Sequence, residues 1–395
     1  MSSSFNVDYQ KKELPKKIQT IGLTLFVIGL VIAIAGYAVD STRSSFNNII
    51  MLMFLISVGL GSLFLVGIEY VAGAVWSVPF RRVGEFFAAV LLVALVASIP
   101  LLFNLGSIFH WMHPEVLKMD ETLKGKAPYL NTNFFIIRVI AFFVIWLSFY
   151  YFITKNSTKQ DLSRNQGLTT ANIKLSAIFM PIFAFTLSFS AIDWMMSLEP
   201  HWFSTIFGVY YFSGTVLAAL SVVTIATVLL NKNGYFVKGL DADHYYSLGA
   251  LLFAFTNFWA YIAFSQYMLI WYANLPEETA WFMLRWAGNW KFISMGLILF
   301  HFVIPYFGLL SQPSKMDPKR LLIMASVILF AHFYDLYWMI MPTFSKAGIL
   351  FGWIELGFLI LAAGLIVLVF VYRSKKNNFI PVGDPKLQRG LEFKL

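Results

Sequence analysis

The stretch NIIMLMFLISVGLGSLFLVGIEYVAGAVWS, residues 48–77, carries only one charged side chain, Glu69. A helix needs about 20 consecutive apolar residues to cross the hydrocarbon core of a bilayer. The stretch therefore predicts a membrane-spanning helix that holds a carboxylate in its interior.

The composition of the whole chain agrees with this prediction. Of its 395 residues 59% are hydrophobic and 12% are charged, and the mean hydropathy is +0.71. Soluble domains average about 25% charged residues, so an integral membrane protein is expected. The chain has no Cys, which excludes thiolate-bound iron–sulfur clusters, c-type haem attachment and disulfides within it.

Further apolar runs predict an all-α protein of ten transmembrane helices. They lie at roughly 18–39, 48–77, 84–106, 133–154, 174–197, 203–230, 246–273, 289–310, 319–341 and 348–372. The polar ends, 1–17 and 373–395, are expected to be cytoplasmic tails around a single transmembrane domain, 18–372. No polar segment is long enough to bury the core of a soluble domain.

The basic residues predict the orientation of these spans. Of 29 Lys and Arg residues, 21 fall in the tails and the alternate loops on their side, and 7 fall in the other loops. Cytoplasmic loops carry the excess of positive charge, so both termini are expected in the cytoplasm. This distribution accounts for the net charge of +9 without a nucleic-acid partner.

The loops 107–132 and 274–288, on the expected outer side, are amphipathic and rich in Trp. Both suit anchoring at the lipid interface and equally suit contact with an outer subunit.

Ionisable residues inside the predicted spans are the candidate functional residues, because each costs at least about 2.5 kcal/mol at the centre of a membrane helix. The candidates for a proton path are Glu69, Glu85, Asp193, His301, His332, Asp335 and Glu355, with Arg138 as a possible ion-pair partner. Glu69 and Glu85 are expected in the cytoplasmic half, His301 near the middle, and the others in the outer half. Carboxylates and histidines divided in this way suit two half-channels or a proton relay.

Structural alternatives apply to several of these residues. His332 and Asp335 are three residues apart and would share a helix face, so they could simply pair with each other. Arg138 needs a counter-ion, which Asp193 could supply. His301 could be a hydrogen-bonded core histidine.

Glu85 follows Arg81 and Arg82 and could form a solvated pair at the membrane surface. Glu69 is harder to assign to packing, because the glycines around it allow close helix approach and leave little room for water outside a defined path.

No intrinsic haem or metal site is expected. Only His301 and His332 lie within predicted spans, and the expected topology puts them at different depths, which does not suit bis-histidine haem ligation. Phosphate-binding loops, nucleophile elbows and HExxH motifs are absent from the sequence.

The segment SAIDWMMSLEPHWFSTIFGVYYFSG, residues 190–214, and RRVGE, residues 81–85, together with the ten-span plan, resemble a family. They are similar to the second NrfD-like membrane subunit, the ActF type, of bacterial alternative complex III, within the superfamily of polysulfide reductase membrane anchors. The resemblance covers essentially the whole chain. It implies a core of two four-helix bundles with one extra helix at each end.

The resemblance also implies a function. The chain would be a non-catalytic subunit, in a bacterial inner membrane, of a respiratory quinol:cytochrome c (or other electron acceptor) oxidoreductase. It would scaffold the complex, and proton half-channels are a further role that the resemblance suggests. The quinol, menaquinone by expectation, would give its electrons to iron–sulfur clusters and c-type haems on partners. Those partners would be a larger NrfD-like subunit, an iron–sulfur subunit and multihaem cytochrome c subunits, with lipids and a terminal oxidase as further contacts.

Within the family signature, Asp193 is expected at the outer edge of the membrane, with Glu199 and His201 reaching the aqueous face. Trp194 and Trp202 are expected to be interfacial anchors.

Two other functions remain open from the sequence. The chain could bind quinone itself, as the membrane anchor of a polysulfide-reductase-like complex, or it could be purely structural. A secondary transporter is disfavoured because paired interrupted helices are not recognisable.

Overall fold

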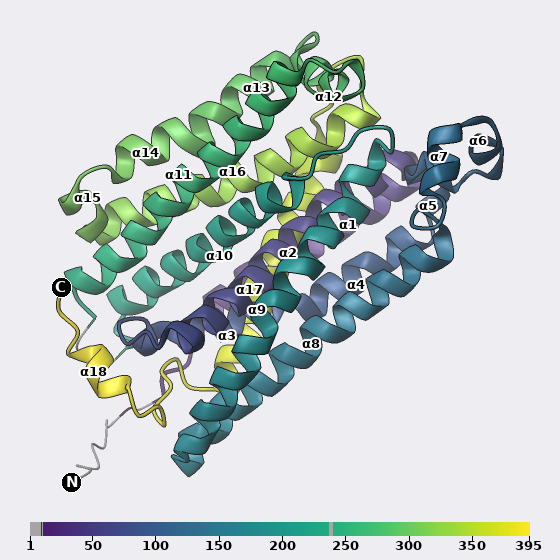
Figure 1. Ribbon diagram of the computed structural model, residues 1–395. Helices are drawn as coiled ribbons and strands as arrows, with labels where there is room; N and C mark the ends of the chain where they lie inside the picture. The colour runs from purple at the N-terminus through teal and green to yellow at the C-terminus, as the bar shows by residue number, and fades with distance from the viewer. Residues whose placement is uncertain (1–8, 10, 237–239) are drawn as a thin grey trace.

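The computed structural model describes residues 9, 11–236 and 240–395, and within them the chain is helical with no β-strand. Ten helical segments in this part of the chain are long and apolar enough to cross a membrane, which makes it a multi-pass membrane protein (Figure 1). The spans are α1 (Lys16–Val39), α2 (Ser41–Ala72), η1 (Val78–Phe80) with α3 (Arg81–Ala88) and α4 (Val90–Leu102), α8 (Thr132–Ser163), α9 (Gln166–Trp194) with η3 (Met196–Leu198), α10 (Phe207–Lys232), α11 (Ala242–Ala273), α13 (Trp290–Ile298) with η4 (Leu299–Val303) and α14 (Ile304–Leu309), α16 (Pro318–Phe344) and α17 (Trp353–Lys376).

Shorter helices fill the connections. They are α5 (Leu105–Ile108), η2 (His110–Met112), α6 (Pro114–Met119), α7 (Glu121–Lys126), α12 (Pro276–Trp286), α15 (Gln312–Met316) and α18 (Leu387–Leu391). The C-terminus and α18 lie at one end of the bundle, and α5, α6, α7 and α12 lie at the other (Figure 1). We call these the terminal end and the opposite end.

Local sequence sets where several spans begin and end. The side chains of Asp40, Asn131, Asp241 and Asp317 each accept a hydrogen bond from a backbone N–H in the first turn of α2, α8, α11 and α16. Such caps satisfy N–H groups that have no partner within the helix. Gly73, with φ of 65°, ends α2 in the left-handed conformation that glycine tolerates best.

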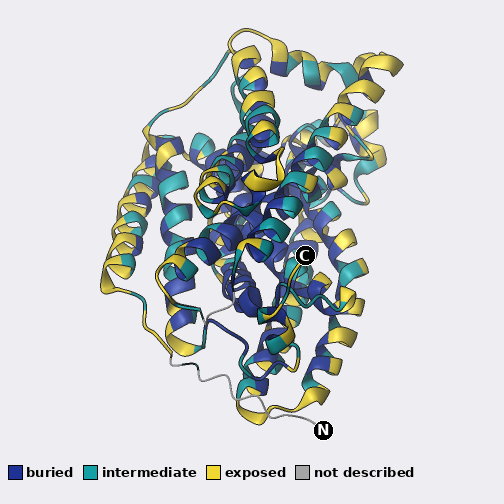
Figure 2. Cartoon of the chain, turned by 90° about the vertical axis from the view of Figure 1, so that its left-hand side faces the viewer, coloured by how far each residue is buried: buried dark blue, intermediate teal, exposed yellow. Residues whose placement is uncertain are grey.

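The core spans form two groups of four. The first group is α2, α3 with α4, α8 and α9, and the second is α10, α11, α13 with α14, and α16. The helices α2 and α10 pack against each other and join the groups. In each of them 89% of the residues in the most apolar 18-residue stretch are buried. Figure 2 shows buried residues along the centre of the molecule and exposed residues on the outer helices. The expected pair of four-helix bundles is therefore present, with α1 and α17 as the extra helices.

The two extra helices pack against each other, a contact that the sequence did not predict. Gly22, Gly29 and Gly36 recur every seven residues on α1, and Gly364 of α17 faces the backbone of Phe26. Small residues at such spacing let two membrane helices approach closely.

The Gly29→Ala substitution is expected to destabilise this helix pair. A Cβ at Gly29 would lie 2.6 Å from Cα of Leu361, and overpacking of this kind typically costs about 1–3 kcal/mol. Gly106 in α5 is the matched control, because a Cβ there meets nothing within 4 Å. The apparent melting temperature in detergent should fall for Gly29→Ala and not for Gly106→Ala, and equal values would contradict the close approach of α1 and α17.

The segment after α17 is not a free tail. Its Phe379, Ile380 and Leu387 are buried against the terminal end, and the Asp384 carboxylate accepts a hydrogen bond of 2.6 Å from Nη2 of Arg81. The segment expected as a C-terminal tail therefore covers the polar residues at this end.

Candidate functional site

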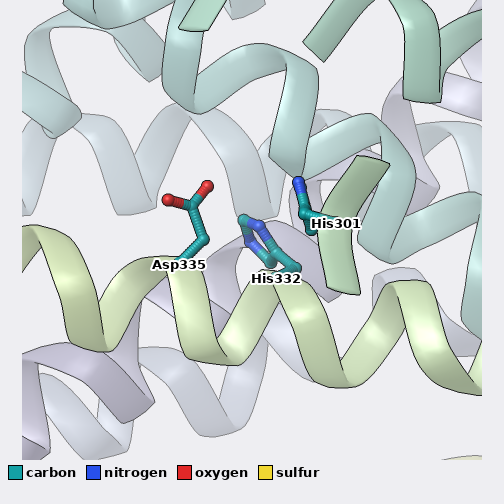
Figure 3. A group of neighbouring side chains, drawn as sticks. All are labelled: His301, His332 and Asp335. Atoms are coloured by element: carbon teal, nitrogen blue, oxygen red, sulfur yellow. The ribbon is translucent and has the colours of Figure 1, made fainter. Parts of the chain in front are cut away.

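Three of the predicted residues meet in the middle of the second bundle. His332 and Asp335 lie one turn apart on α16, and His301 approaches them from η4 (Figure 3). One donor atom from each residue lies within 4.8 Å of the others, and all three residues are at most 1% exposed. We call this group the central cluster. Two imidazoles and a carboxylate are donors that suit a transition-metal ion, and they equally suit storage of a proton.

Asp335 is held without a cationic partner. Its two carboxylate oxygens accept one hydrogen bond of 2.6 Å from the hydroxyl of Tyr210 and one of 3.0 Å from Nε1 of Trp259. Among the described residues no Lys or Arg lies at ion-pair distance from it. A buried carboxylate normally needs a partner, and in the described structure the hydroxyl of Tyr210 and the indole N–H of Trp259 are the groups that bind it. The expected direct pairing of His332 with Asp335 does not occur as a hydrogen bond.

His332 extends the cluster towards the first bundle. Its Nε2 lies 2.9 Å from Oγ of Ser57 on α2, and that hydroxyl lies 3.0 Å from the Tyr211 hydroxyl and 3.3 Å from the Thr215 hydroxyl. A Cβ at Gly214 would lie 2.5 Å from Nδ1 of His332, so the imidazole fits only beside a glycine.

His301 owes its position to a widened turn. Residues 299–303 form a π-helical turn, and Pro305 follows four residues after His301. Proline has no N–H for the carbonyl four residues earlier and its ring clashes with that carbonyl, which explains why the helix widens here. Turns of this kind are frequent at functional sites.

The surroundings of His301 correct two expectations. Its ring centroid lies 4.0 Å from that of Trp259 and 6.4 Å from that of His332, so the expected difference in depth between the two histidines is wrong. Within the described part of the chain neither of its ring nitrogens has a hydrogen-bond partner. It is therefore not the hydrogen-bonded core histidine that the sequence allowed.

Glu69 and Glu85 belong to a second cluster, at the terminal end. Arg81 donates from Nη1 to Glu69 at 3.0 Å and from Nη2 to Asp384, and its Nε lies 3.6 Å from Glu85. Arg82 lies 3.3 Å from Glu85 and donates to Asp161 at 2.9 Å.

This second cluster is buried, which the sequence did not predict. Glu85 is 1% exposed and Arg82 is not exposed, so the alternative of a solvated pair at the membrane surface is wrong. Asp161 and Asp384 were not candidates, because both lie outside the predicted spans and meet the arginines only in the folded chain. A pocket of about 190 Å³ is lined by Glu69, Arg81 and Ser77, so Glu69 borders a pocket at this end.

Further buried hydroxyls lie on α2 and α10. Ser57, Ser62 and Glu69 follow one another along α2, over about 18 Å at 1.5 Å per residue. Ser62 of α2, and Ser221 and Thr224 of α10, are buried, and in the described residues their hydroxyls have no hydrogen-bond partner. Buried hydroxyls of this kind are usually satisfied by ordered water. Helices α2 and α10 therefore carry buried hydroxyls in addition to that of Ser57, which contacts His332.

The remaining candidates form ion pairs at the opposite end. Asp193 accepts from Nε of Arg138 at 2.8 Å and from its Nη2 at 2.9 Å, and it also accepts from the Tyr129 hydroxyl. The predicted counter-ion of Arg138 is thus confirmed. Glu355 accepts from Nε and Nη2 of Arg43 at 2.8 and 2.7 Å. Both pairs have the geometry of structural anchors.

The signature segment differs from its expected placement in one respect. Trp194 and Trp202 are 2% and 4% exposed, so they are packing residues in this chain and not the expected interfacial anchors. Trp202 stacks on Trp281 of α12 at 4.5 Å between ring centroids. His201 does reach the surface, with 56% of its side chain exposed and its Nε2 2.9 Å from Asp120.

Comparison with known proteins leaves this geometry as the main guide to function, because no family model and no curated protein sequence matches the chain.

Proposed function

We propose that the chain is a membrane subunit of a respiratory quinol-oxidising complex and that its central cluster passes protons through the membrane. The observation that carries the proposal is Asp335, a buried carboxylate with no cationic partner and with two buried histidines beside it. Such an arrangement costs free energy in a membrane protein. Ionisable residues inside a membrane are for that reason rare and usually functional. The sequence resemblance to the second NrfD-like subunit of alternative complex III supports the choice of complex.

The path that we propose has two ends. Protons would enter or leave at the terminal end through Glu69, which borders the pocket there, and would cross between α2 and α10 along the buried hydroxyls. Hydroxyls and bound water can relay protons between titratable groups, whereas apolar side chains cannot. The excess of Lys and Arg at the terminal end supports placing it in the cytoplasm of a bacterial cell.

The chain would not be catalytic on its own. It has no Cys to hold an iron–sulfur cluster or to attach c-type haem, so electron transfer would take place on sister subunits. Its part would be to hold those subunits together and to link quinol oxidation to proton movement.

A purely structural role is the second candidate, and it fits the opposite end best. Arg138 with Asp193, and Arg43 with Glu355, are satisfied ion pairs that need no transport to explain them. The central cluster does not fit this role, because within the described residues His301 forms no hydrogen bond that would offset the cost of burying its ring nitrogens.

Purification of the affinity-tagged chain from its native membrane tests the choice of complex. We expect c-type haem, visible as covalently bound haem on denaturing gels, and quinol:acceptor activity to elute with it. A chain that elutes alone, monodisperse and without haem, would contradict the proposal.

A further inference from the structure

A cavity of about 630 Å³ lies in the second bundle, beside the central cluster. Its walls come from α10, α11, α12, α13, η4 and α16, and no acidic or basic side chain of the described residues lines it. Tyr210 and Trp259, which hold Asp335, form part of the wall, and Trp281, Trp286 and Trp338 form another part. The volume and the aromatic lining are those of pockets that bind flat, uncharged small molecules.

The cavity is bordered by residues on the outside of the bundle. Tyr261 and Phe264 of α11 are 65% and 58% exposed, and Ile298 of α13 is 54% exposed. All three lie within spans, where the surroundings of a membrane protein are lipid. A ligand would therefore reach the cavity from the bilayer and not from water.

One polar group in the wall is left without a partner. Gln266 of α11 is 3% exposed, and its Oε1 is buried with no hydrogen-bond partner in the described structure. By contrast, the Ser294 hydroxyl donates to the carbonyl of Arg285 and accepts from Nε1 of Trp338. A buried amide oxygen without a hydrogen bond is unfavourable, so Gln266 marks the place where a ligand group would bind.

The wall on the side of α12 is fixed in place. Arg285 is fully buried and donates to the backbone carbonyls of Trp338 and Met339, and its guanidinium lies 3.4 Å from the centroid of the Trp281 ring. Burial lowers the pKa of Arg285, and the nearby Glu199 carboxylate offsets part of this effect. These bonds hold α12 against α16, so the aromatic wall is formed before any ligand arrives.

We propose that this pocket binds an uncharged lipid whose ring carries an oxygen atom. The ring would lie among the tryptophans, its hydroxyl group would donate a hydrogen bond to Oε1 of Gln266, and its apolar tail would leave towards the bilayer past Tyr261 and Phe264. Isoprenoid quinols and polycyclic alcohols share this chemistry. The inference stands on the pocket alone and does not depend on the proposed proton path.

Photolabelling in nanodiscs tests the site. The protein, purified with the partners that it retains, would be offered three photoreactive probes: a short-tailed naphthoquinol, a sterol and a phosphatidylcholine. We expect a ring probe to label the peptides that contain Tyr261, Phe264 and Gln266 more strongly than the phospholipid probe does. Labelling by the quinol alone or the sterol alone identifies the source of the ligand, and labelling by both assigns the shared ring chemistry. Equal labelling by the phospholipid, or none, overturns the proposal.

Variants separate binding in the pocket from adventitious contact. Ala263→Phe fills the cavity and should abolish labelling by the ring probe. Ala363→Phe is the matched control, since Ala363 lines a different apolar cavity, of about 450 Å³, between α1, α10, α16 and α17; it should leave the labelling unchanged.

The volume-conserving variant Gln266→Leu removes only the hydrogen bond and should weaken binding of the ring probe about tenfold, the effect of about 1.4 kcal/mol. Because this change leaves the packing volume in place, it answers the question even if the Ala263→Phe protein does not fold. Unchanged affinity in Gln266→Leu together with unchanged labelling in Ala263→Phe would overturn the site.

Discussion

Replacing Asp193 with alanine is expected to lower the free energy of unfolding by about 3–5 kcal/mol. The substitution would leave the guanidinium of Arg138 buried without its carboxylate, since their side chains are 8% and 1% exposed. The other acceptor of Arg138 is the backbone carbonyl of Tyr129, which cannot neutralise the charge. The apparent melting temperature in detergent, followed by fluorescence size-exclusion chromatography, should drop by several degrees.

Two controls identify the cause of this loss. Glu121→Ala breaks the exposed pair with Lys124, whose side chain is 45% exposed, and should cost less than about 1 kcal/mol. The double substitution of Arg138 and Asp193 by leucine removes both charges and should restore much of the stability, because a buried ion pair can often be replaced by apolar residues. An Asp193→Ala protein as stable as Glu121→Ala would show that the pair does not anchor α8 to α9.

The fold could be predicted from the sequence because the membrane simplifies the problem. Runs of apolar residues longer than the hydrocarbon core leave helix as the available structure, and ten such runs give ten spans. The pairing of Arg138 with Asp193 was predictable for a related reason, since an arginine in a span has to find a counter-ion. These inferences need only hydropathy and charge.

The close approach of His301 and His332 could not be predicted from hydropathy. The π-helical turn before Pro305 changes the face of the helix on which His301 lies. The depth of His332 was misplaced for another reason, because the span predicted to end at residue 341 continues to Phe344 in α16. The proline four residues after His301 was the signal that could have warned of an irregular turn.

Contacts between residues far apart in the sequence could not be predicted either. Asp384 lies 303 residues after Arg81, and the C-terminal segment folds back over the terminal end to bring them together. Trp194 and Trp202 resemble interfacial anchors by composition, and only the packing of the connecting helices buries them.

Asp335→Asn is expected to have the largest effect on function. Asparagine keeps the size of the side chain, and its oxygen can accept from Trp259 while its amide donates to the Tyr210 oxygen, so the fold should be retained. It cannot, however, take up and release a proton. If the proposed complex is correct, quinol oxidation on its other subunits should therefore continue while the protons moved per electron fall to the value set by quinol chemistry alone.

Glu199→Gln provides the matched control for this prediction. Glu199 lies outside the central cluster and accepts a hydrogen bond of 2.8 Å from Thr343, so removing its charge should leave the proton stoichiometry unchanged. A fall in both variants would indicate a general loss of coupling and not a path through Asp335.

The most direct test of the proton path is the number of protons moved per electron by the purified complex in sealed proteoliposomes, measured with an entrapped pH dye during quinol oxidation. The proposed path predicts that Asp335→Asn lowers this number while the rate of quinol oxidation and the assembly of the complex persist. A normally assembled Asp335→Asn complex with the unaltered number of protons per electron would contradict it.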